Sequence, residues 1–259
     1  MPIAALPDAQ IHYELRGPEN LPLLVFSNSL GTTLEMWDSQ VGEFTKHFRV
    51  LRYDTRGHGR SEATPGDYSI AKLADDVLQL LDLLQFERVF FCGLSMGGAI
   101  GIRLGAYAPQ RFRKLVLCNT AAKFGTIETW NARIQAVQSG GMKAVAGTVV
   151  ERWFTEAFRN AHLLETETIR TMLENANPHG YLSCCAAVRD VDARPYLPDV
   201  RVPSLVLTGA HDPVAPPAEA RHLVANIPAS RYAEVSAAHL SNIEARDDFN
   251  LHVLNFLLS

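Results

Sequence analysis

Short runs of consecutive apolar residues recur along the chain, and amphipathic segments lie between them. Runs such as Leu-Leu-Val-Phe and Val-Phe-Phe-Cys are apolar at every position, which is typical of parallel strands that helices cover on both faces. In the segment 69–86, apolar residues recur at steps of three and four, which predicts a helix with one apolar face. By these patterns we expect strands at residues 10–16, 23–28, 49–54, 88–94, 114–119, 204–209 and 231–235, and helices at 69–86, 97–108, 217–226 and 246–258.

The alternation of strands and helices predicts a three-layer α/β fold, because helices that join parallel strands form right-handed crossovers. The alternation stops after Asn119, and only helical patterns follow until about residue 190. Such an insertion is expected as a lid over the carboxyl edge of the sheet, where parallel sheets bind ligands. We therefore divide the chain into a core, residues 1–121 and 191–259, and a helical lid, residues 122–190. The lid helices are expected at 129–139, 142–154, 161–175 and 180–188.

The 259 residues include 24 Lys and Arg and 28 Asp and Glu, which gives a formal net charge of −4. This balance, without a run of basic residues, argues against a nucleic-acid partner and against a polybasic membrane anchor. No apolar stretch reaches the roughly 18 residues that a membrane span needs, and the first residues lack the features of a signal peptide. Four cysteines without metal-ligand spacing are expected as reduced, buried thiols. We therefore expect a cytoplasmic protein without a metal site, and its oligomeric state stays open.

The sequence Gly93-Leu-Ser-Met-Gly97 follows a predicted strand and precedes a predicted helix, which places Ser95 at a sharp turn. This G-x-S-x-G pattern indicates a nucleophile whose hydroxyl stands above the sheet edge. The turn would crowd positions 93 and 97 against each other, so only glycine fits there. The helix that follows points its N-terminus, with its partial positive charge, at the site. The pentapeptide alone is also compatible with an ordinary glycine-rich turn and an idle serine.

A serine hydroxyl needs a base within hydrogen-bond reach, and the base needs an acid that orients it. In this architecture the acid and the histidine follow the serine along the chain, at the ends of later strands. Asp212 follows the predicted strand 204–209, and His239 follows the predicted strand 231–235. The order and the positions predict the catalytic triad Ser95–His239–Asp212.

Other polar residues are less well placed to serve as acid or base. Asn119 ends an earlier strand but cannot ionise, and Asp190 and Asp192 lie in the exit from the lid. His211 adjoins Asp212, but a neighbouring side chain points elsewhere. The other histidines apart from His58 are expected on solvated surface elements or on the lid, namely His12, His47, His162, His179, His222 and His252.

Acyl transfer also needs two hydrogen-bond donors for the negative oxygen of the tetrahedral intermediate. One is expected to be the backbone N–H of Met96, the residue after the nucleophile. The other should come from the turn after the strand 23–28, and we choose the N–H of Leu30. Gly31 would let the chain bend back toward the serine there, although an ordinary strand-end turn would carry the same glycine.

Asp54-Thr-Arg-Gly-His-Gly-Arg-Ser61 is similar to the D-x-R-G-x-G-x-S turn of the α/β-hydrolase fold superfamily, and the chain resembles that superfamily over nearly its whole length. The turn is mainly structural in relatives, which implies that His58 braces a loop. Many members carry His-Gly at the oxyanion turn, whereas this chain has Asn28-Ser29. Asn28-Ser-Leu-Gly-Thr, with Met36-Trp37 and Gln40 after it, resembles the 3-oxoadipate enol-lactonases, as do Tyr53-Asp-Thr-Arg-Gly-His-Gly, Cys92-Gly-Leu-Ser-Met-Gly-Gly98 and Asn119-Thr-Ala121.

This resemblance implies an α/β-hydrolase fold, with a mostly parallel, twisted sheet flanked by helices and an all-helical lid inserted after the sixth strand. It also implies hydrolysis of a small lactone with a carboxymethyl arm to 3-oxoadipate, in the β-ketoadipate pathway of aromatic compound degradation. The triad chemistry would need neither a metal nor an organic cofactor. The partner would be this anionic small molecule alone.

The carboxylate of such a substrate would be costly to bury without a cationic partner. Arg133 is the first candidate in the lid, because it shares a predicted helix with Trp130, one turn away. Trp153 could line the apolar side of the pocket. Each residue also has a plainer interpretation, since lid aromatics usually pack and an arginine is usually solvated.

Two rival functions stay open at this point. A carboxylesterase or a cofactor-free perhydrolase would use the same triad on another small ester, because lid residues set the substrate. A small-molecule receptor of the same fold would keep the triad and signal through the lid, but the charges along residues 128–170 argue against an apolar docking face there. Steady-state turnover would separate an enzyme from a receptor.

Overall fold

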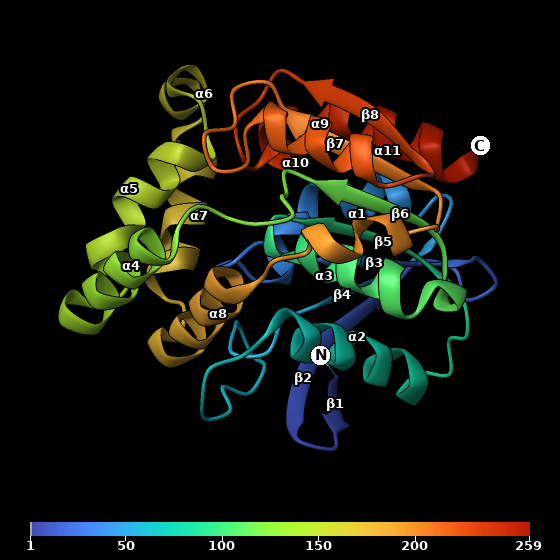
Figure 1. Ribbon diagram of the computed structural model, residues 1–259, viewed down its shortest axis with the longest axis horizontal. Coiled ribbons are helices and arrows are strands. Elements are labelled where there is room, and N and C mark those ends of the chain that lie inside the picture. Colours follow the sequence, from blue (N-terminus) through green and yellow to red (C-terminus); the bar gives the residue numbers. More distant parts are fainter. Residues whose placement is uncertain (1) are drawn as a thin grey trace.

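An eight-stranded sheet forms the centre of the computed structural model, which describes residues 2–259. The strands lie in the order β1-β2-β4-β3-β5-β6-β7-β8 (Figure 1). β2 pairs antiparallel with both β1 and β4, and every other neighbouring pair is parallel. The strands are β1 (Ile3–Leu6), β2 (Ala9–Arg16), β3 (Leu23–Ser27), β4 (Arg49–Tyr53), β5 (Val89–Leu94), β6 (Phe112–Cys118), β7 (Ser204–Gly209) and β8 (Ser230–Val235).

All seven strands predicted from the apolar runs are present, and each end lies within two residues of its predicted position. The predicted runs are buried because helices cover them: every residue of β3 and of β7 is buried. The eighth strand, β1, was not predicted. It has only four residues, of which every second one is exposed, so no apolar run marks it.

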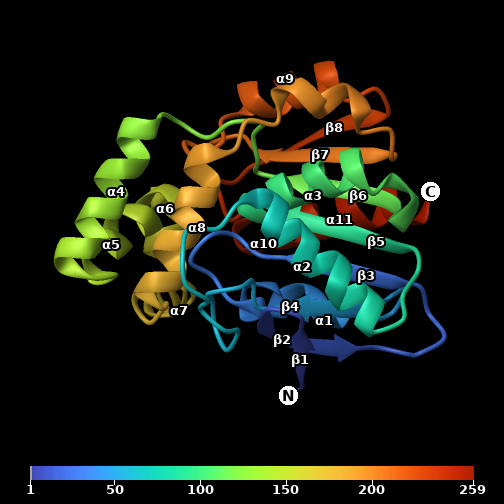
Figure 2. The same ribbon diagram turned by 60° about the horizontal axis from the view of Figure 1, so that its bottom comes forward.

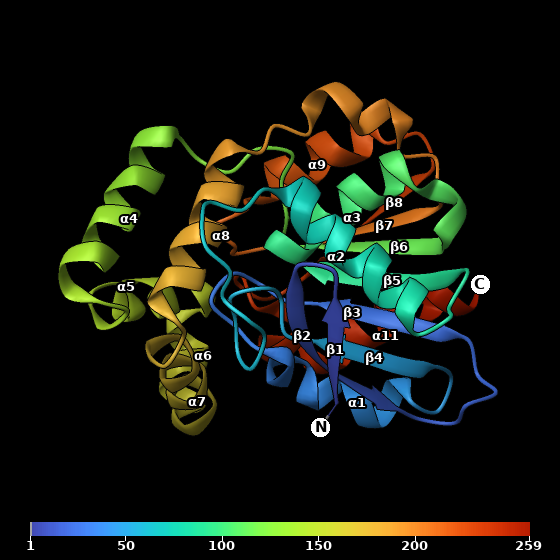
Figure 3. The same cartoon turned by 90° about the horizontal axis from the view of Figure 1, so that it is seen from below.

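Helices cover both faces of the sheet, with α2, α3 and α9 on one side and α1 and α11 on the other (Figure 3). The helices that the apolar periodicity predicted are all present. Two short helices, α1 and α10, were not predicted, because seven and four residues are too few to show a periodicity. The core helices are α1 (Asp38–Phe44), α2 (Ile70–Leu83), α3 (Met96–Tyr107), α9 (Pro217–Asn226), α10 (Ser241–Glu244) and α11 (Arg246–Leu258), with 3-10 turns at η1 (Leu34–Trp37), η2 (Pro109–Arg111) and η3 (Arg194–Asp199).

The chain between β6 and β7 is helical and gathers at one end of the sheet (Figures 1 and 2). Its helices are α4 (Ile127–Gly140), α5 (Lys143–Trp153), α6 (Glu156–Ala161), α7 (Leu163–Glu174) and α8 (Pro178–Asp190). α6 was not predicted as a separate helix. Thr155 begins it by accepting a hydrogen bond from the Phe158 N–H, and the chain breaks at His162 before α7 starts.

His12 is buried, so its expected position on a solvated surface element is wrong. Only 1% of the residue is exposed, and its Nδ1 lies 2.7 Å from Asp54 Oδ2. Its backbone N–H donates to Ser61 Oγ, and Ser61 in turn donates to the Asp54 carbonyl. The turn 54–61 therefore covers β2, a contact between segments more than forty residues apart that the local pattern of β2 does not reveal.

No helix among residues 2–259 is both long enough and apolar enough to cross a membrane. This agrees with the hydropathy of the sequence. The four cysteines are free and buried, as expected from their spacing.

A buried ion pair fastens the turn 54–61 to helix α2. Arg56, which is 2% exposed, donates from Nε and Nη2 to the two carboxylate oxygens of Asp76 at 2.8 and 2.6 Å. Its Nη2 also donates to Asp8 at 2.9 Å, but the Asp8 side chain is half exposed. The bidentate contact to Asp76 satisfies the guanidinium away from water, which is the condition under which a buried charge is tolerated.

Asp76→Ala should therefore destabilise the fold by about 3–5 kcal/mol, because it leaves the Arg56 charge buried without its main partner. Asp8→Ala removes the exposed partner of the same arginine and should cost at most about 1 kcal/mol. Urea denaturation of both variants measures the difference. Equal losses in the free energy of unfolding would show that Asp76 stabilises the fold no more than the exposed Asp8 does.

Candidate active site

A sharp turn joins β5 to α3 and carries Ser95. Ser95 adopts φ 59° and ψ −113°, a strained conformation for a residue with a side chain. A Cβ on Gly93 would overlap the carbonyl oxygen of Gly97, and a Cβ on Gly97 would overlap that of Ser27. The crowding inferred from the sequence is therefore present, and it explains why glycine occupies both positions.

The strained turn is held by hydrogen bonds on both sides of the serine. The Ser95 N–H donates to the Cys118 carbonyl at 2.9 Å, and Thr120 Oγ1 donates to the Ser95 carbonyl at 2.8 Å. Both partners belong to the end of β6 and the segment that follows it. The hydroxyl of Ser95 has no hydrogen-bond partner within the described residues 2–259, and 7% of the residue is exposed.

His239 and Asp212 form a buried pair near the ends of β8 and β7. His239 Nδ1 lies 2.8 Å from Asp212 Oδ2, and the two side chains are 1% and 0% exposed. Because Nδ1 is bound to the carboxylate, Nε2 is the ring nitrogen left to exchange a proton. The structure thus joins two of the three predicted triad residues directly. Between Ser95 and His239 it records no hydrogen bond, and such contacts are often long before substrate binds.

The Asp212 carboxylate is surrounded by donors. Its Oδ1 accepts from the N–H groups of Val214 at 2.7 Å and Ala215 at 3.1 Å, and its Oδ2 also accepts from Asn119 Nδ2 at 2.9 Å. Burial alone would raise the pKa of Asp212, but His239 and the donors outweigh it, so the pKa lies below the ordinary value. Asp212 is therefore ionised at neutral pH and can orient a histidine.

Asn119 has a place at this site that the sequence did not predict. It was set aside because it cannot ionise, yet its amide donates to Asp212 and to the Ala238 carbonyl, at 2.9 and 3.1 Å. Its own oxygen accepts from Ser241 Oγ at 2.5 Å. Asn119, at the end of β6, thus stabilises the carboxylate of Asp212, which follows β7. The pairing of β6 with β7 brings the two residues together, and the sequence does not show this.

The two proposed oxyanion donors lie on the turns that follow β3 and β5. Among the turn and loop hydrogen bonds of residues 2–259, none uses the N–H of Leu30 or of Met96. Gly31 has φ +84° and donates from its own N–H to His58 Nε2 at 2.8 Å. Burial lowers the pKa of His58, although the Arg56 carbonyl opposes this, so the ring is neutral and can accept. His58 braces the turn that presents Leu30.

Asn28 is a structural residue of this turn. Its Nδ2 donates to the Tyr53 carbonyl at 2.8 Å, and its Oδ1 accepts from Trp37 Nε1 at 3.0 Å. Its backbone carbonyl accepts from the Gly97 N–H at 3.0 Å. The residue therefore connects the oxyanion turn to the start of α3.

Trp130 and Arg133 line one cavity of about 230 Å³ between the lid and the loop that carries Asp212. The Arg133 guanidinium carbon lies 4.8 Å from the centre of the Trp130 ring, and Trp130 Nε1 donates to the Phe124 carbonyl at 2.7 Å. Val214, two residues after Asp212, forms the core side of the cavity. Trp153 is not among its lining residues: it is buried, and its carbonyl accepts from the Leu240 N–H at 3.0 Å.

A second arginine, Arg152, lines the same cavity and was not predicted as a site residue. Its Nη2 donates to the Pro213 carbonyl at 3.0 Å. Burial lowers the pKa of Arg152, and the nearby positive charge of Arg133 lowers it further. Within residues 2–259 neither arginine forms an ion pair, although most other arginines do. Two uncompensated guanidinium groups at one cavity are suited to bind an anion.

The side chains that could bind a metal ion are scattered over the described residues. In the described part of the chain, no group of three or more His, Cys, Asp or Glu side chains could hold a metal ion. Burial raises the pKa of the Cys184 thiol well above its ordinary value, and Cys185 has a pKa of about 12 for the same reason. These thiols are therefore protonated at neutral pH.

Comparison with known proteins places this architecture in a family. Residues 22–158 match the family model of the alpha/beta hydrolase fold. The chain belongs to the α/β-hydrolase family. This hydrolase is 41% identical to 3-oxoadipate enol-lactonase 2 of Acinetobacter baylyi, over 94% of its own length and 91% of the relative's. It is 37% identical to 3-oxoadipate enol-lactonase 1 of the same organism, over 91% and 88% of the two chains.

A solved structure shows the same likeness in three dimensions. The enol-lactonase from Burkholderia xenovorans LB400 matches this hydrolase with a TM-score of 0.98 and 45% identity, and the match covers 100% of both chains. The resemblance to enol-lactonases is therefore confirmed, as is the fold class. The relatives are hydrolases of ester bonds, and this chain is an enzyme of that class.

The lowered pKa of Asp212 predicts how this residue contributes to stability at different pH. Ionised Asp212 favours the folded state at any pH above its unfolded pKa of about 3.9, and the contribution is lost as the pH falls through the lower folded pKa. The stability advantage of the wild type over Asp212→Asn should therefore be larger at pH 7 than at pH 3. Urea denaturation at both pH values measures it, and an advantage that grows toward pH 3 would contradict the assignment.

Proposed function

We propose that this α/β hydrolase opens the lactone ring of 3-oxoadipate enol-lactone with water and releases 3-oxoadipate. The observation that carries the proposal is that Arg133 and Arg152, which form no ion pair within residues 2–259, line one cavity bordered by Val214. The substrate bears a free carboxylate, which a neutral pocket would leave without a partner. The relatives named 3-oxoadipate enol-lactonases support the same substrate.

In the first half-reaction Ser95 Oγ attacks the lactone carbonyl while His239 Nε2 accepts its proton. Substrate binding brings the hydroxyl within hydrogen-bond distance of that nitrogen. Asp212, bound to Nδ1 at 2.8 Å, fixes the tautomer and stabilises the imidazolium. The N–H groups of Leu30 and Met96 stabilise the oxyanion. The ring C–O bond then breaks, and His239 returns the proton to the departing enolate, which becomes a ketone while the acyl group stays on Ser95.

The second half-reaction releases the acid. His239 takes a proton from water, and the resulting nucleophile attacks the acyl group on Ser95. The ester bond to the serine breaks, and the proton returns to its oxygen. The triad needs neither a metal nor an organic cofactor for these steps, and the substrate is its only partner. The reaction would serve the β-ketoadipate pathway of aromatic compound degradation, in the cytoplasm.

In this proposal residues 122–190 act as the lid and residues 1–121 and 191–259 as the catalytic core. The lid supplies Trp130 and Arg133 from α4 and Arg152 from α5, and Val214 of the Asp212 loop lines the same cavity. Tyr181 of α8 lies against Gly31 of the oxyanion turn. Lid residues thus border both the proposed carboxylate site and the oxyanion turn. Trp153, whose side chain is buried, would help to shape the apolar part of the site.

A small neutral ester is the rival substrate, and a perhydrolase would use the same triad. Assays on 3-oxoadipate enol-lactone beside simple neutral esters separate these functions. We expect kcat/KM for the lactone to exceed that for the neutral esters. Faster hydrolysis of a neutral ester would favour a carboxylesterase. The receptor alternative is not retained, because the close relatives are enzymes.

Ser95→Ala should lower kcat by roughly 10³–10⁶-fold, as deletion of a triad nucleophile does in other hydrolases. Circular dichroism and urea denaturation should show a folded protein, since the variant removes only a hydroxyl that has no hydrogen-bond partner among residues 2–259. Retention of more than a tenth of the wild-type activity would remove Ser95 from the mechanism.

Arg133→Ala should raise KM for the anionic lactone by about 10–100-fold, because a hydrogen bond to a charged group contributes about 1.5–3 kcal/mol. KM for a neutral ester should change by less than about twofold. Lys143→Ala is the matched control, since it removes an exposed lid cation that does not line the cavity. Equal effects of Arg133→Ala on both substrates would remove this arginine from carboxylate binding.

A further inference from the structure

Both neighbours of His239 are hydrogen-bonded across the seam between the lid and the core. The Ala238 N–H donates to Glu244 Oε2 at 2.8 Å, and the Leu240 N–H donates to the Trp153 carbonyl at 3.0 Å. Glu244 is also bound to the lid, because the Thr155 N–H donates to its Oε1 at 3.2 Å and Thr155 Oγ1 donates to the same oxygen. The backbone on either side of the histidine is therefore tied to lid residues 153–155.

The local structure explains why the carboxylate of Glu244 can reach both sides. Glu244 ends the single turn of α10, which begins at Ser241, two residues after His239. Thr155 precedes α6 and uses its hydroxyl oxygen to accept from the Phe158 N–H at 3.2 Å, so its hydroxyl hydrogen is free to donate to Glu244. The start of α6 and the loop that carries His239 thus share one acceptor, the Glu244 carboxylate.

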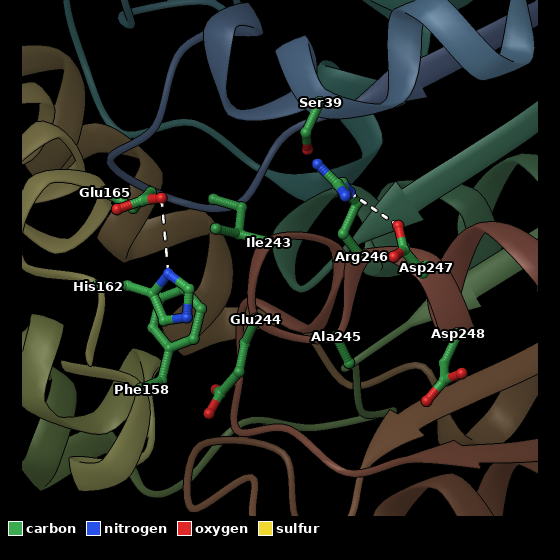
Figure 4. A pocket seen from close by; sticks show the side chains of 10 residues that line it. All are labelled: Ser39, Phe158, His162, Glu165, Ile243, Glu244, Ala245, Arg246, Asp247 and Asp248. Carbon is green, nitrogen blue, oxygen red and sulfur yellow. Dashed lines mark hydrogen bonds and ion pairs between the residues drawn. The ribbon is translucent and has the colours of Figure 1, made fainter. Parts of the chain in front are cut away.

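Figure 4 shows Glu244 among the side chains that line a cavity of about 490 Å³, where residues 158–165 face residues 243–248. Glu244 lies between Phe158 and His162 of the lid on one side and Ala245 and Asp248 of the core on the other. None of Ser95, Asp212 and His239 lines this cavity. Glu244 contacts the histidine loop through the Ala238 N–H, next to His239, and not through the imidazole ring.

The chemistry of the contact requires an ionised carboxylate. The Ala238 N–H, the Thr155 N–H and the Thr155 hydroxyl all donate to Glu244, and a carboxylate is a pure acceptor with several lone pairs. A glutamine of the same shape would offer one acceptor oxygen and would turn an N–H group toward another donor. Loss of the charge on Glu244 would thus break its hydrogen bond to Ala238 or those to Thr155.

We propose that Glu244 is a positioning residue that couples the lid to the general base, by fixing the backbone of His239 relative to lid residues 153–155. The proposal rests on the proposed function in one respect, since it takes His239 as the base for Ser95. Displacement of a catalytic group by about 1 Å can cost about 100-fold in rate. A loosened histidine loop should therefore lower the rate of the chemical step more than it weakens substrate binding.

Glu244→Gln tests the coupling through kcat and KM for the lactone and for p-nitrophenyl acetate. We expect kcat to fall by about 10-fold to 100-fold on both substrates, with KM within about threefold of the wild type. The matched control is Asp247→Asn, which neutralises an exposed carboxylate of the same cavity that pairs, among the described residues, with Arg246 alone. It should leave kcat unchanged.

The lid side of the contact is tested by Thr155→Val and Thr155→Ser. Valine removes the hydroxyl that donates to Glu244 and should lower kcat by about threefold to tenfold, whereas serine keeps the hydroxyl and should recover most of that rate. Circular dichroism and thermal denaturation establish that each variant is folded at the assay temperature. If Glu244→Gln does not fold, the valine and serine pair decides the question alone.

The outcomes separate positioning from other roles. A kcat within twofold of the wild type for folded Glu244→Gln, or for Thr155→Val if the glutamine variant does not fold, would overturn the proposal. So would a rise in KM for the lactone alone, because that would make Glu244 part of the substrate pocket. If the wild type hydrolyses p-nitrophenyl acetate but not the lactone, the proposed substrate is wrong, while the effect of Glu244 on ester hydrolysis still tests the coupling.

Discussion

The site depends on one close approach of backbone to backbone, where β5 turns into α3. Gly93 lies so close to Gly97 that it has no room for a Cβ, and Gly97 has none because it lies against Ser27 at the end of β3. This contact forces Ser95 into its strained conformation and brings the start of α3 against the oxyanion turn. On a relaxed turn, the serine hydroxyl would not be exposed at the edge of the sheet.

The buried Arg56 and the two cavity-lining arginines, Arg133 and Arg152, use their charges differently. Arg56 is buried in the core and bound to both oxygens of Asp76, so its charge is fully used to hold the turn 54–61 in place. Arg133 and Arg152 of the lid form no ion pair within the described residues and face the same cavity. Arg56 therefore stabilises the fold, whereas Arg133 and Arg152 leave their charge available to an anionic ligand.

Much of this arrangement could be predicted from the sequence, because it depends on local sequence patterns. Most of the buried strands contain runs of consecutive apolar residues, and Ser95, Asp212 and His239 each follow a predicted strand. What escaped prediction depends on contacts between distant segments. Asn119 meets Asp212 only because β6 pairs with β7, and His12 is buried only because the turn 54–61 covers β2. Arg152 and Glu244 acquire their partners where the lid meets the core.

Covalent labelling tests the central claim, that Ser95 is the nucleophile, most directly. An organophosphate ester should label the enzyme once per chain, and mass spectrometry of peptides should place the adduct on Ser95. Activity should fall in proportion to the labelled fraction. A fully labelled enzyme that stays active, or an adduct on another residue that accounts for the lost activity, would contradict the account.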